Sequence, residues 1–442
     1  MTTQKQIPNS NTHPAAMTSN GRNAPLLTPY AVDAGYKTWI LFVIILVAVC
    51  GAVLVLAQDQ AAKPPARQQQ YQISSLPSVG GTASGGNSIN DQSWVAGYSR
   101  YPDRNRHAAL WRSSLLTDLG TLGGPNSSVA WNVKNTAGIL VGISQTLTPE
   151  PVENWSSAAF YSTPNNVGYI NLGFVWENNQ MRALPNFPGG NNGFATGANN
   201  LRQAVGWAET GVHDDTCCCQ DEPRHQVFQF LPAMWTLRPP DQIHELPLIP
   251  GDTSGAATAI NDNGQIVGIS GICDQAEGRR TAKHAVLWEN GTVTDIYPDA
   301  PAPWWNTPTA INQHGDVVGF AGDPAFVEGE VLLAFIWTKD NGIKVLKPLR
   351  GRVPEHVDSE AYGINEARQV VGVSCDAEQV DCRAVIWNHG VYPTDLNDLK
   401  GGYSAVLALA KDINDKGEIT GRAVDPITGV LTAYLAVPVG GH

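Results

Sequence analysis

A cysteine-rich stretch, HDDTCCCQDEPRH at residues 213–225, carries the most reactive side chains of the sequence. Thiolate and imidazole groups at short spacing can bind zinc, but three adjacent cysteines do not match the paired spacing of a zinc knuckle. Cysteines of exported proteins are more often oxidised to disulfides. We therefore expect disulfide bonds here and no bound metal, with zinc and free thiols as the alternatives.

Three other cysteines extend this expectation. Cys375 and Cys382 lie in one short loop between apolar runs, so we expect them to bond to each other. Cys273 lies in the equivalent loop one repeat after the CCC stretch, and we expect it to bond to one of those three cysteines, for which we take Cys218. The pairing itself stays open, because six cysteines outside the N-terminal apolar segment allow many combinations.

Loop aromatic residues form the second candidate site. Trp304 and Trp305 lie in a Pro-rich loop, PDAPAPWWNT, outside any strand pattern, and Trp155 and Tyr161 lie in a long insertion. Such side chains suit a sugar ring or the apolar patch of a protein partner. The alternative is that the paired tryptophans cover a neighbouring repeat.

Enzyme signatures are sparse. The sequence contains no G-x-S-x-G, H-E-x-x-H, P-loop or G-x-G-x-x-G motif, and no pair of carboxylates stands out from turn positions. We therefore expect no cofactor and no catalytic residues. A catalytic site assembled from several repeats remains the alternative, because no local motif would reveal it.

A repeated motif holds these side chains in place. From residue 71 onward, an asparagine stands seven positions before a glycine in seven successive units, as in AINDNGQIVGIS at 259–270. The asparagines are Asn90, Asn135, Asn199, Asn261, Asn312, Asn365 and Asn414, and the glycines are Gly97, Gly142, Gly206, Gly268, Gly319, Gly372 and Gly421. An asparagine beside a turn most often caps backbone groups, so we expect that role rather than ligand binding.

Each unit contains four short apolar runs separated by turn residues. An apolar run ending in Trp follows the glycine in six units, and Ala436 takes the Trp place in the seventh. Runs of this length rich in Val, Ile and Trp predict strands, with the Trp packed between repeats. Seven units of four strands predict an all-β fold, a seven-bladed β-propeller over residues 71–442, with a β-solenoid as the alternative. The segment 71–81 should supply the strand that the last repeat lacks and close the ring.

The paired elements I-N-x-x-G-x-x-V-G and H-A-x-x-W, followed by DLGTLGG at 118–124, resemble the HAF repeat, which is named for a His-Ala-Phe core. Only His107 and His284 keep the histidine, and a phenylalanine follows the alanine only at Phe335. The resemblance implies an exported, extracellular repeat domain. It brings no activity and no catalytic residues.

The N-terminus indicates where the protein resides. We expect residues 1–36 to be a disordered cytoplasmic tail. The segment WILFVIILVAVCGAVLVLA at 39–57 contains no charged residue and is long enough to cross a bilayer. We expect residues 37–57 to be a retained signal-anchor, with a cleaved signal peptide or a lipidated Cys50 as alternatives. Residues 58–70 read as a linker. The expected protein is single-pass, with its propeller in the periplasm or outside the cell.

Net charge and loop length limit the classes of function that we expect. A net charge of −12 argues against a nucleic-acid partner. The longest departures from the repeat, 143–172 and 207–231, join second to third strands and should form one rim, where binding faces of repeat proteins often lie. We therefore expect a non-catalytic protein-binding or scaffolding module at the cell envelope. A carbohydrate-binding module is the first alternative, and a hydrolase or lyase with a central-channel site is the second.

Overall fold

The structure is a computed structural model that describes residues 69–113, 115–151, 168–217, 226–274, 280–298, 305–322 and 331–440. These residues belong to one compact unit. No helix within them is long and apolar enough to span a membrane. The expected tail, anchor and most of the linker lie outside the described residues, so those expectations remain predictions.

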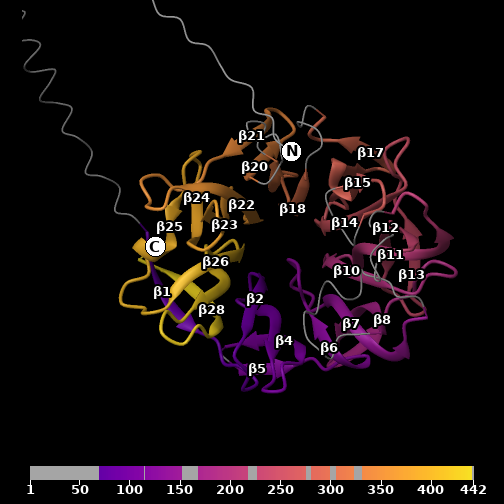
Figure 1. Ribbon diagram of the computed structural model, residues 1–442, viewed down its shortest axis with the longest axis horizontal. Coiled ribbons are helices and arrows are strands. Elements are labelled where there is room, and N and C mark those ends of the chain that lie inside the picture. The colour runs from indigo at the N-terminus through magenta and orange to yellow at the C-terminus, as the bar shows by residue number, and fades with distance from the viewer. Residues whose placement is uncertain are drawn as a thin grey trace, which may run out of the picture. The chain divides into compact units, whose positions relative to one another are not determined.

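The described chain forms seven four-stranded antiparallel sheets arranged around a common centre, which is the predicted propeller (Figure 1). We number the sheets blades 1 to 7. Blades 1 to 3 are β2(Ser84–Ile89), β3(Val95–Arg100), β4(Arg106–Arg112) and β5(Leu115–Asp118); β6(Gly123–Ser128), β7(Leu140–Pro149), β8(Tyr169–Glu177) and β9(Gln180–Ala183); β10(Gly193–Ala198), β11(Gln203–His213), β12(Phe228–Thr236) and β13(Gln242–Glu245).

Blades 4 to 6 follow in the same order, from the centre outward. They are β14(Ser254–Ile260), β15(Ile266–Gly271), β16(His284–Glu289) and β17(Thr292–Asp295); β18(Thr307–Ile311), β19(Val317–Gly322), β20(Leu332–Thr338) and β21(Gly342–Leu346); β22(His356–Ile364), β23(Gln369–Asp376), β24(Cys382–Asn388) and β25(Thr394–Asp395). The described residues contain two short 3-10 helices, η1(Thr281–Lys283) and η2(Leu396–Asp398).

Blade 7 is assembled from both ends of the described chain. Its inner strands are β26(Val406–Ile413), β27(Ile419–Val424) and β28(Leu431–Val439), and its outer strand is β1(Gln70–Ser75). β1 pairs antiparallel with β28 from Gln70 opposite Val439 to Ser75 opposite Tyr434. The predicted closure is confirmed, and it removes the free sheet edges that an open array would expose.

The repeated tryptophans pack between blades, as predicted. Trp111, Trp235 and Trp387 are almost completely buried. The indole N–H of Trp111 donates to the carbonyl of Pro77 at 2.8 Å, and that of Trp288 donates to Pro247 at 2.6 Å. Each bond reaches back to the preceding blade, so the side chain fixes the spacing of neighbouring blades as well as filling it.

The repeated glycine is required by the close approach of the innermost strand. A Cβ atom on Gly206 would lie 1.9 Å from the carbonyl oxygen of Phe194, and one on Gly421 would lie 1.9 Å from that of Leu409. No side chain fits at these positions without moving backbone. The close approach therefore lies between the first and second strands of each blade.

Candidate functional site

The repeated asparagines form a closed ring of hydrogen bonds at one end of the propeller. In six of the seven blades the side-chain amide donates to the carbonyl of the next blade's asparagine, and Asn135 donates to Ala198 instead. The distances are 2.9, 3.2, 3.0, 2.9, 3.3, 3.1 and 2.9 Å for Asn90, Asn135, Asn199, Asn261, Asn312, Asn365 and Asn414. We call this end the asparagine end. The opposite end, which holds the second-to-third-strand loops and the blade-to-blade connections, is the insertion end.

Each asparagine also caps its own hairpin. The Oδ1 atom of Asn261 accepts from the backbone N–H groups of Asn263 at 3.1 Å and Gln265 at 3.0 Å. The predicted capping role is thus confirmed. The bond to the next blade was not predicted, although seven repetitions in phase are what a ring contact requires.

Replacing Asn261 by alanine should lower the free energy of unfolding by about 2 kcal/mol, because it removes a cap and leaves the buried Asn312 carbonyl without its donor. Asn263→Ala is the matched control. Asn263 lies in the same hairpin and also donates to the next blade, to Gln313 at 2.7 Å, but it is exposed. Urea unfolding should show a loss below about 0.5 kcal/mol for the control. Equal losses would contradict a structural role for the ring.

A second set of bonds surrounds a cavity of about 220 Å³ at the asparagine end. In six of the seven blades the residue after the asparagine accepts, through a side-chain oxygen, from the backbone N–H of a neighbouring blade. The N–H of Asp415 donates to Asp91 Oδ1 at 2.9 Å, and that of Asn200 donates to Asp262 Oδ1 at 2.8 Å. Because these carboxylates accept backbone bonds, the fold accounts for the acidic residues here without a metal.

Blade 2 has two additional residues between the partner of the repeat glycine and the asparagine. In the other blades the partner of the repeat glycine lies four positions before the asparagine, as Gly86 does opposite Gly97. In blade 2 the pairing ends at Ser128 opposite Ile143, so Val129 would face Gly142 and Asn135 follows six positions later. Residues 129–134, which belong to no strand, form what we call the crossing segment.

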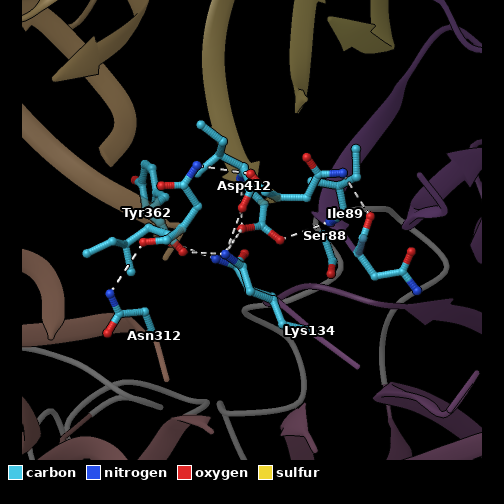
Figure 2. A network of polar contacts seen from close by, with 12 residues as sticks. Ser88, Ile89, Lys134, Asn312, Tyr362 and Asp412 are labelled. Atoms are coloured by element: carbon cyan, nitrogen blue, oxygen red, sulfur yellow. Dashed lines mark hydrogen bonds and ion pairs between the residues drawn. The ribbon is translucent and has the colours of Figure 1, made fainter. Parts of the chain in front are cut away.

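The crossing segment bonds to the far side of the propeller, where Lys134 meets Asp412 (Figure 2). The Lys134 ammonium donates to the carbonyl of Ile413 at 2.7 Å and to that of Ile364 at 2.5 Å, and it lies 3.1 Å from Asp412 Oδ1. The Asn132 amide donates to the carbonyl of Tyr362 at 2.6 Å. Blade 2 is not adjacent to blades 6 and 7, so these contacts can form only inside the channel.

Asp412 is the fully buried partner of Lys134. Its Oδ2 accepts from the backbone N–H of Ile89 and its Oδ1 from that of Ile413, both at 2.9 Å. Burial raises the pKa of Asp412, whereas the Lys134 charge and the two backbone bonds oppose that rise. The pair therefore joins blades 1, 2, 6 and 7 through one charge contact.

A second cluster lies further along the channel toward the insertion end. The Lys411 ammonium lies 3.7 Å from the centre of the Tyr362 ring and 5.3 Å from that of Trp131. The Tyr362 hydroxyl donates to Glu360 Oε2 at 2.6 Å. Burial and the charge of Arg422 together lower the pKa of Lys411 to about 7, although the charges of Glu360 and Asp412 oppose this. Burial also raises the pKa of Glu360.

Tyr362 and Lys411 occupy a repeat position that is structural elsewhere. Three residues before the asparagine, Thr196, Thr258 and Thr309 donate to the next blade's carbonyl at 2.9, 2.7 and 2.8 Å. Asn87 does the same at 2.8 Å. In blades 6 and 7 this bonding residue is replaced, and both substitutes meet the crossing segment, Tyr362 through the bond from Asn132 to its carbonyl and Lys411 over the Trp131 ring. The replacement is visible in the sequence when the repeats are aligned at the position three residues before the asparagine.

Of the aromatic residues predicted to bind a ligand, only Trp305 belongs to the described residues. Trp304, Trp155 and Tyr161 lie outside them. Trp305 is partly buried in an apolar cluster that also contains Trp131, and its ring meets Phe320 edge-on with centroids 6.4 Å apart. Trp305 thus packs against Phe320 of blade 5, in agreement with the alternative that it covers a neighbouring repeat. The residues that sequence reasoning missed are Trp131, Lys134, Glu360, Tyr362, Lys411 and Asp412.

Both expected disulfides form, with one correction. Cys375 bonds to Cys382 within the β23–β24 hairpin. Cys273 bonds to Cys217 rather than to Cys218, because a turn in which the Cys217 N–H donates to Asp214 directs that first cysteine toward blade 4. Asp214 lies close to both sulfurs, but neither sulfur is a thiolate ligand while they are bonded. The bond joins the insertion of blade 3 to blade 4.

The motif histidines are structural. The Nδ1 atom of His107 lies 2.9 Å from Asp118, and that of His284 lies 2.7 Å from Asp295. Burial alone would raise the pKa of Asp118, but bonds from His107, Tyr101 and the Gly120 N–H lower it to about 2. Each pair joins the third and fourth strands of one blade, which accounts for the H-A-x-x-W and D-L elements occurring together.

No protein-family model matches the sequence, and no curated protein matches it. Among solved structures, the chain is similar to a puromycin-hydrolysing peptidase of Mycobacterium tuberculosis, with 10% identity and a TM-score of 0.45 over 82% of this chain and 56% of the peptidase. It is also similar to a polysaccharide lyase, an ulvan lyase, with 10% identity and a TM-score of 0.41 over 84% of this chain and 98% of the lyase.

The β-propeller domain of the trilobed protease of Pyrococcus furiosus has 10% identity and a TM-score of 0.38 over 70% of this chain and 82% of that domain. This chain therefore spans little more than half of the peptidase and nearly all of the lyase. Similarities this low assign neither an activity nor a ligand to the chain.

Proposed function

We propose that the protein is an exported propeller, held at the cell envelope by residues 37–57, that binds a saccharide at the insertion end of its channel without acting on it. The observation that carries this proposal is the convergence of Trp131, Tyr362 and Lys411. Each stands where its blade breaks the repeat, and they come from three blades that meet only in the channel. Functional side chains are expected where otherwise uniform repeats differ.

A saccharide fits this wall better than a flat protein surface does. A partly buried aromatic face beside hydrogen-bonding groups is the arrangement that orients a small ring in a concave site. The two disulfides support the envelope part of the proposal, because such bonds persist in oxidising compartments. A HAF-repeat relationship would agree with export. The predicted protein scaffold would use loops that lie partly outside the described residues, and it remains a prediction.

Replacing Trp131 by alanine should weaken saccharide binding by about tenfold or more, since a half-buried tryptophan at the centre of a site carries much of its binding energy. The assay is a glycan array probed with the full-length chain in detergent. Trp94→Ala is the control, because Trp94 is a partly buried tryptophan that stacks on Arg112 outside the channel cluster. An array without signal for the unaltered protein, or equal signals for both variants, would count against the proposal.

A second candidate function is a hydrolase or lyase that uses the same channel. It is favoured by one observation, the short bond between Tyr362 and Glu360 beside a lysine whose pKa is about 7. Groups with pKa values displaced toward neutrality suit proton transfer. Incubating the protein with the polysaccharides that it binds tests this directly. Release of new reducing ends or of unsaturated sugar products would replace the binding proposal with the catalytic one.

A further inference from the structure

Two cationic side chains lie on paired strands of blade 7, and no carboxylate of the described residues is bonded to either. Lys411 on β26 and Arg422 on β27 make no hydrogen bond or ion pair with any residue that the structure describes. The Nε atom of Arg422 is buried and has no acceptor. Lys134 and Arg182 are partly buried cations that are paired, Lys134 with Asp412 and Arg182 with both Glu177 and Asp241. The Nε atoms of Arg100 and Arg112 also lack an acceptor within the described chain, but these residues lie on blade 1 and not on blade 7.

Within the part of the chain that the structure describes, no neighbouring carboxylate is free to neutralise Lys411 and Arg422. Arg422 pairs with Leu409, two residues before Lys411 on the neighbouring strand, and its charge lowers the pKa of Lys411. Among the carboxylates, the charge of Glu360 acts most strongly on Lys411, but Tyr362 already donates to Glu360 and burial raises its pKa. Asp412 is held by Lys134 and two backbone bonds. Like charges kept together in a low-dielectric site are stabilised by an anion placed between them.

Neighbouring residues leave room for the arginine and add a buried acceptor. A Cβ atom on Gly85 of β2 would lie 3.2 Å from both Cγ and Cδ of Arg422, so a larger residue there would displace its side chain. Asn132 is only 6% exposed, and its Oδ1 has no donor although its amide bonds to Tyr362. An unpartnered acceptor of this kind suits a hydroxyl group of a ligand.

We propose that Lys411 and Arg422 bind the carboxylate of an acidic sugar whose ring packs against Trp131, a ligand class that rests on the saccharide-binding function proposed above. Arginine and lysine together provide charge-assisted donors for a carboxylate. Asn132 then accepts from a ring hydroxyl. The net charge of −12 disfavours the binding of long polyanions. It has little effect on one sugar carboxylate inside the channel, because screening weakens distant charges and the nearby cations attract the carboxylate. The expected ligand is therefore a uronic acid at the end of a chain.

The decisive comparison uses the ligand rather than a variant. Calorimetric titration of the full-length chain in detergent would compare glucuronate with its methyl ester, which keeps the ring and loses the charge. We expect glucuronate to bind about tenfold more tightly or better, since a hydrogen bond to a charged group is stronger than a neutral one. Equal affinities for acid and ester would overturn the proposal. Acetate binding as tightly as glucuronate would also overturn it, because the ring would then contribute nothing.

Substitutions of the two cations test whether they bind the carboxylate. Lys411→Gln and Arg422→Gln should each remove most of the preference for acid over ester, and Lys344→Gln, an exposed lysine on β21, should leave it unchanged. A preference that survives both channel variants would place the acid elsewhere and overturn the proposal. Binding of neutral glycans that depends on Trp131, without any preference for acids, would overturn this inference alone. Failure to bind any saccharide would overturn the proposed function as well.

Discussion

Replacing Lys134 by methionine should lower the free energy of unfolding by about 3 to 5 kcal/mol at neutral pH, because it leaves Asp412 as a buried charge without its partner. Asp412 is completely buried, and the Lys134 ammonium lies 3.1 Å from its Oδ1. The substitution also removes the donor to the carbonyls of Ile364 and Ile413. Urea unfolding followed by tryptophan fluorescence measures the loss.

The double variant Lys134→Met with Asp412→Asn separates charge from packing. An amide at position 412 can still accept from Ile89 and carries no charge, so the double variant should recover a large part of the loss. A double variant as unstable as Lys134→Met alone would contradict the charge explanation. It would instead attribute the loss to the hydrogen bonds of Lys134 with the blade 6 and 7 carbonyls.

The loss in Lys134→Met should also depend on pH, with a sign that burial determines. Burial raises the pKa of Asp412 in the folded state, and the variant lacks the positive charge that opposes this rise. A group whose folded pKa lies above its unfolded value favours folding when it is protonated, and this advantage is lost as pH rises through the folded pKa. The variant should therefore approach the wild type in acid and fall furthest behind it in mild alkali. A deficit independent of pH would show that Asp412 is not the cause.

The sequence was sufficient for the fold because the fold is a repeat. Seven asparagines at a fixed distance from seven glycines specify seven equivalent hairpins, and the incomplete first and last units leave ring closure as the arrangement without free edges. The expected packing of the tryptophans followed from the same regularity. Trp111 and Trp288 donate to equivalent carbonyls of the preceding blades because their surroundings are repeated.

The channel cluster could not be predicted in the same way, because its members are far apart in the sequence and each lies inside a strand or beside one. Asn132 and Tyr362 are brought together only when blades 2 and 6 face each other across the ring. The two-residue insertion that creates the crossing segment is visible in the sequence. That it turns inward depends on Lys134 finding Asp412 and two free carbonyls, which is a property of the closed propeller.

The disulfide partners could also be predicted only in part from the sequence. Spacing correctly linked Cys375 to Cys382, which lie opposite each other in one hairpin. It also linked Cys273 to the CCC stretch, but the choice of cysteine depended on a local turn at Asp214 that the sequence did not specify. Neighbouring residues of a chain point in different directions, so an error of one residue changes the bond without changing the blades that it joins.

Removing the Cys217–Cys273 bond should cost about 4 kcal/mol of unfolding free energy, and removing Cys375–Cys382 should cost about 2.5 kcal/mol, when the loss follows the entropy of the unfolded chain. The first bond closes a sequence separation of 56 residues and the second one of 7. The variants are Cys217→Ala with Cys273→Ala and, as the matched control, Cys375→Ala with Cys382→Ala. Urea unfolding without reductant measures both.

The comparison also tests what the longer bond does for the insertion end. Cys217 and Cys273 are buried and join neighbouring blades, whereas Cys375 and Cys382 belong to one hairpin whose strands already pair. If loop entropy governs both, the interblade bond is the more stabilising, and its loss should also increase hydrogen exchange in β11 and β15 beside the insertion. A larger loss from the hairpin bond would contradict this and would mean that blade packing alone fixes the base of the blade 3 insertion.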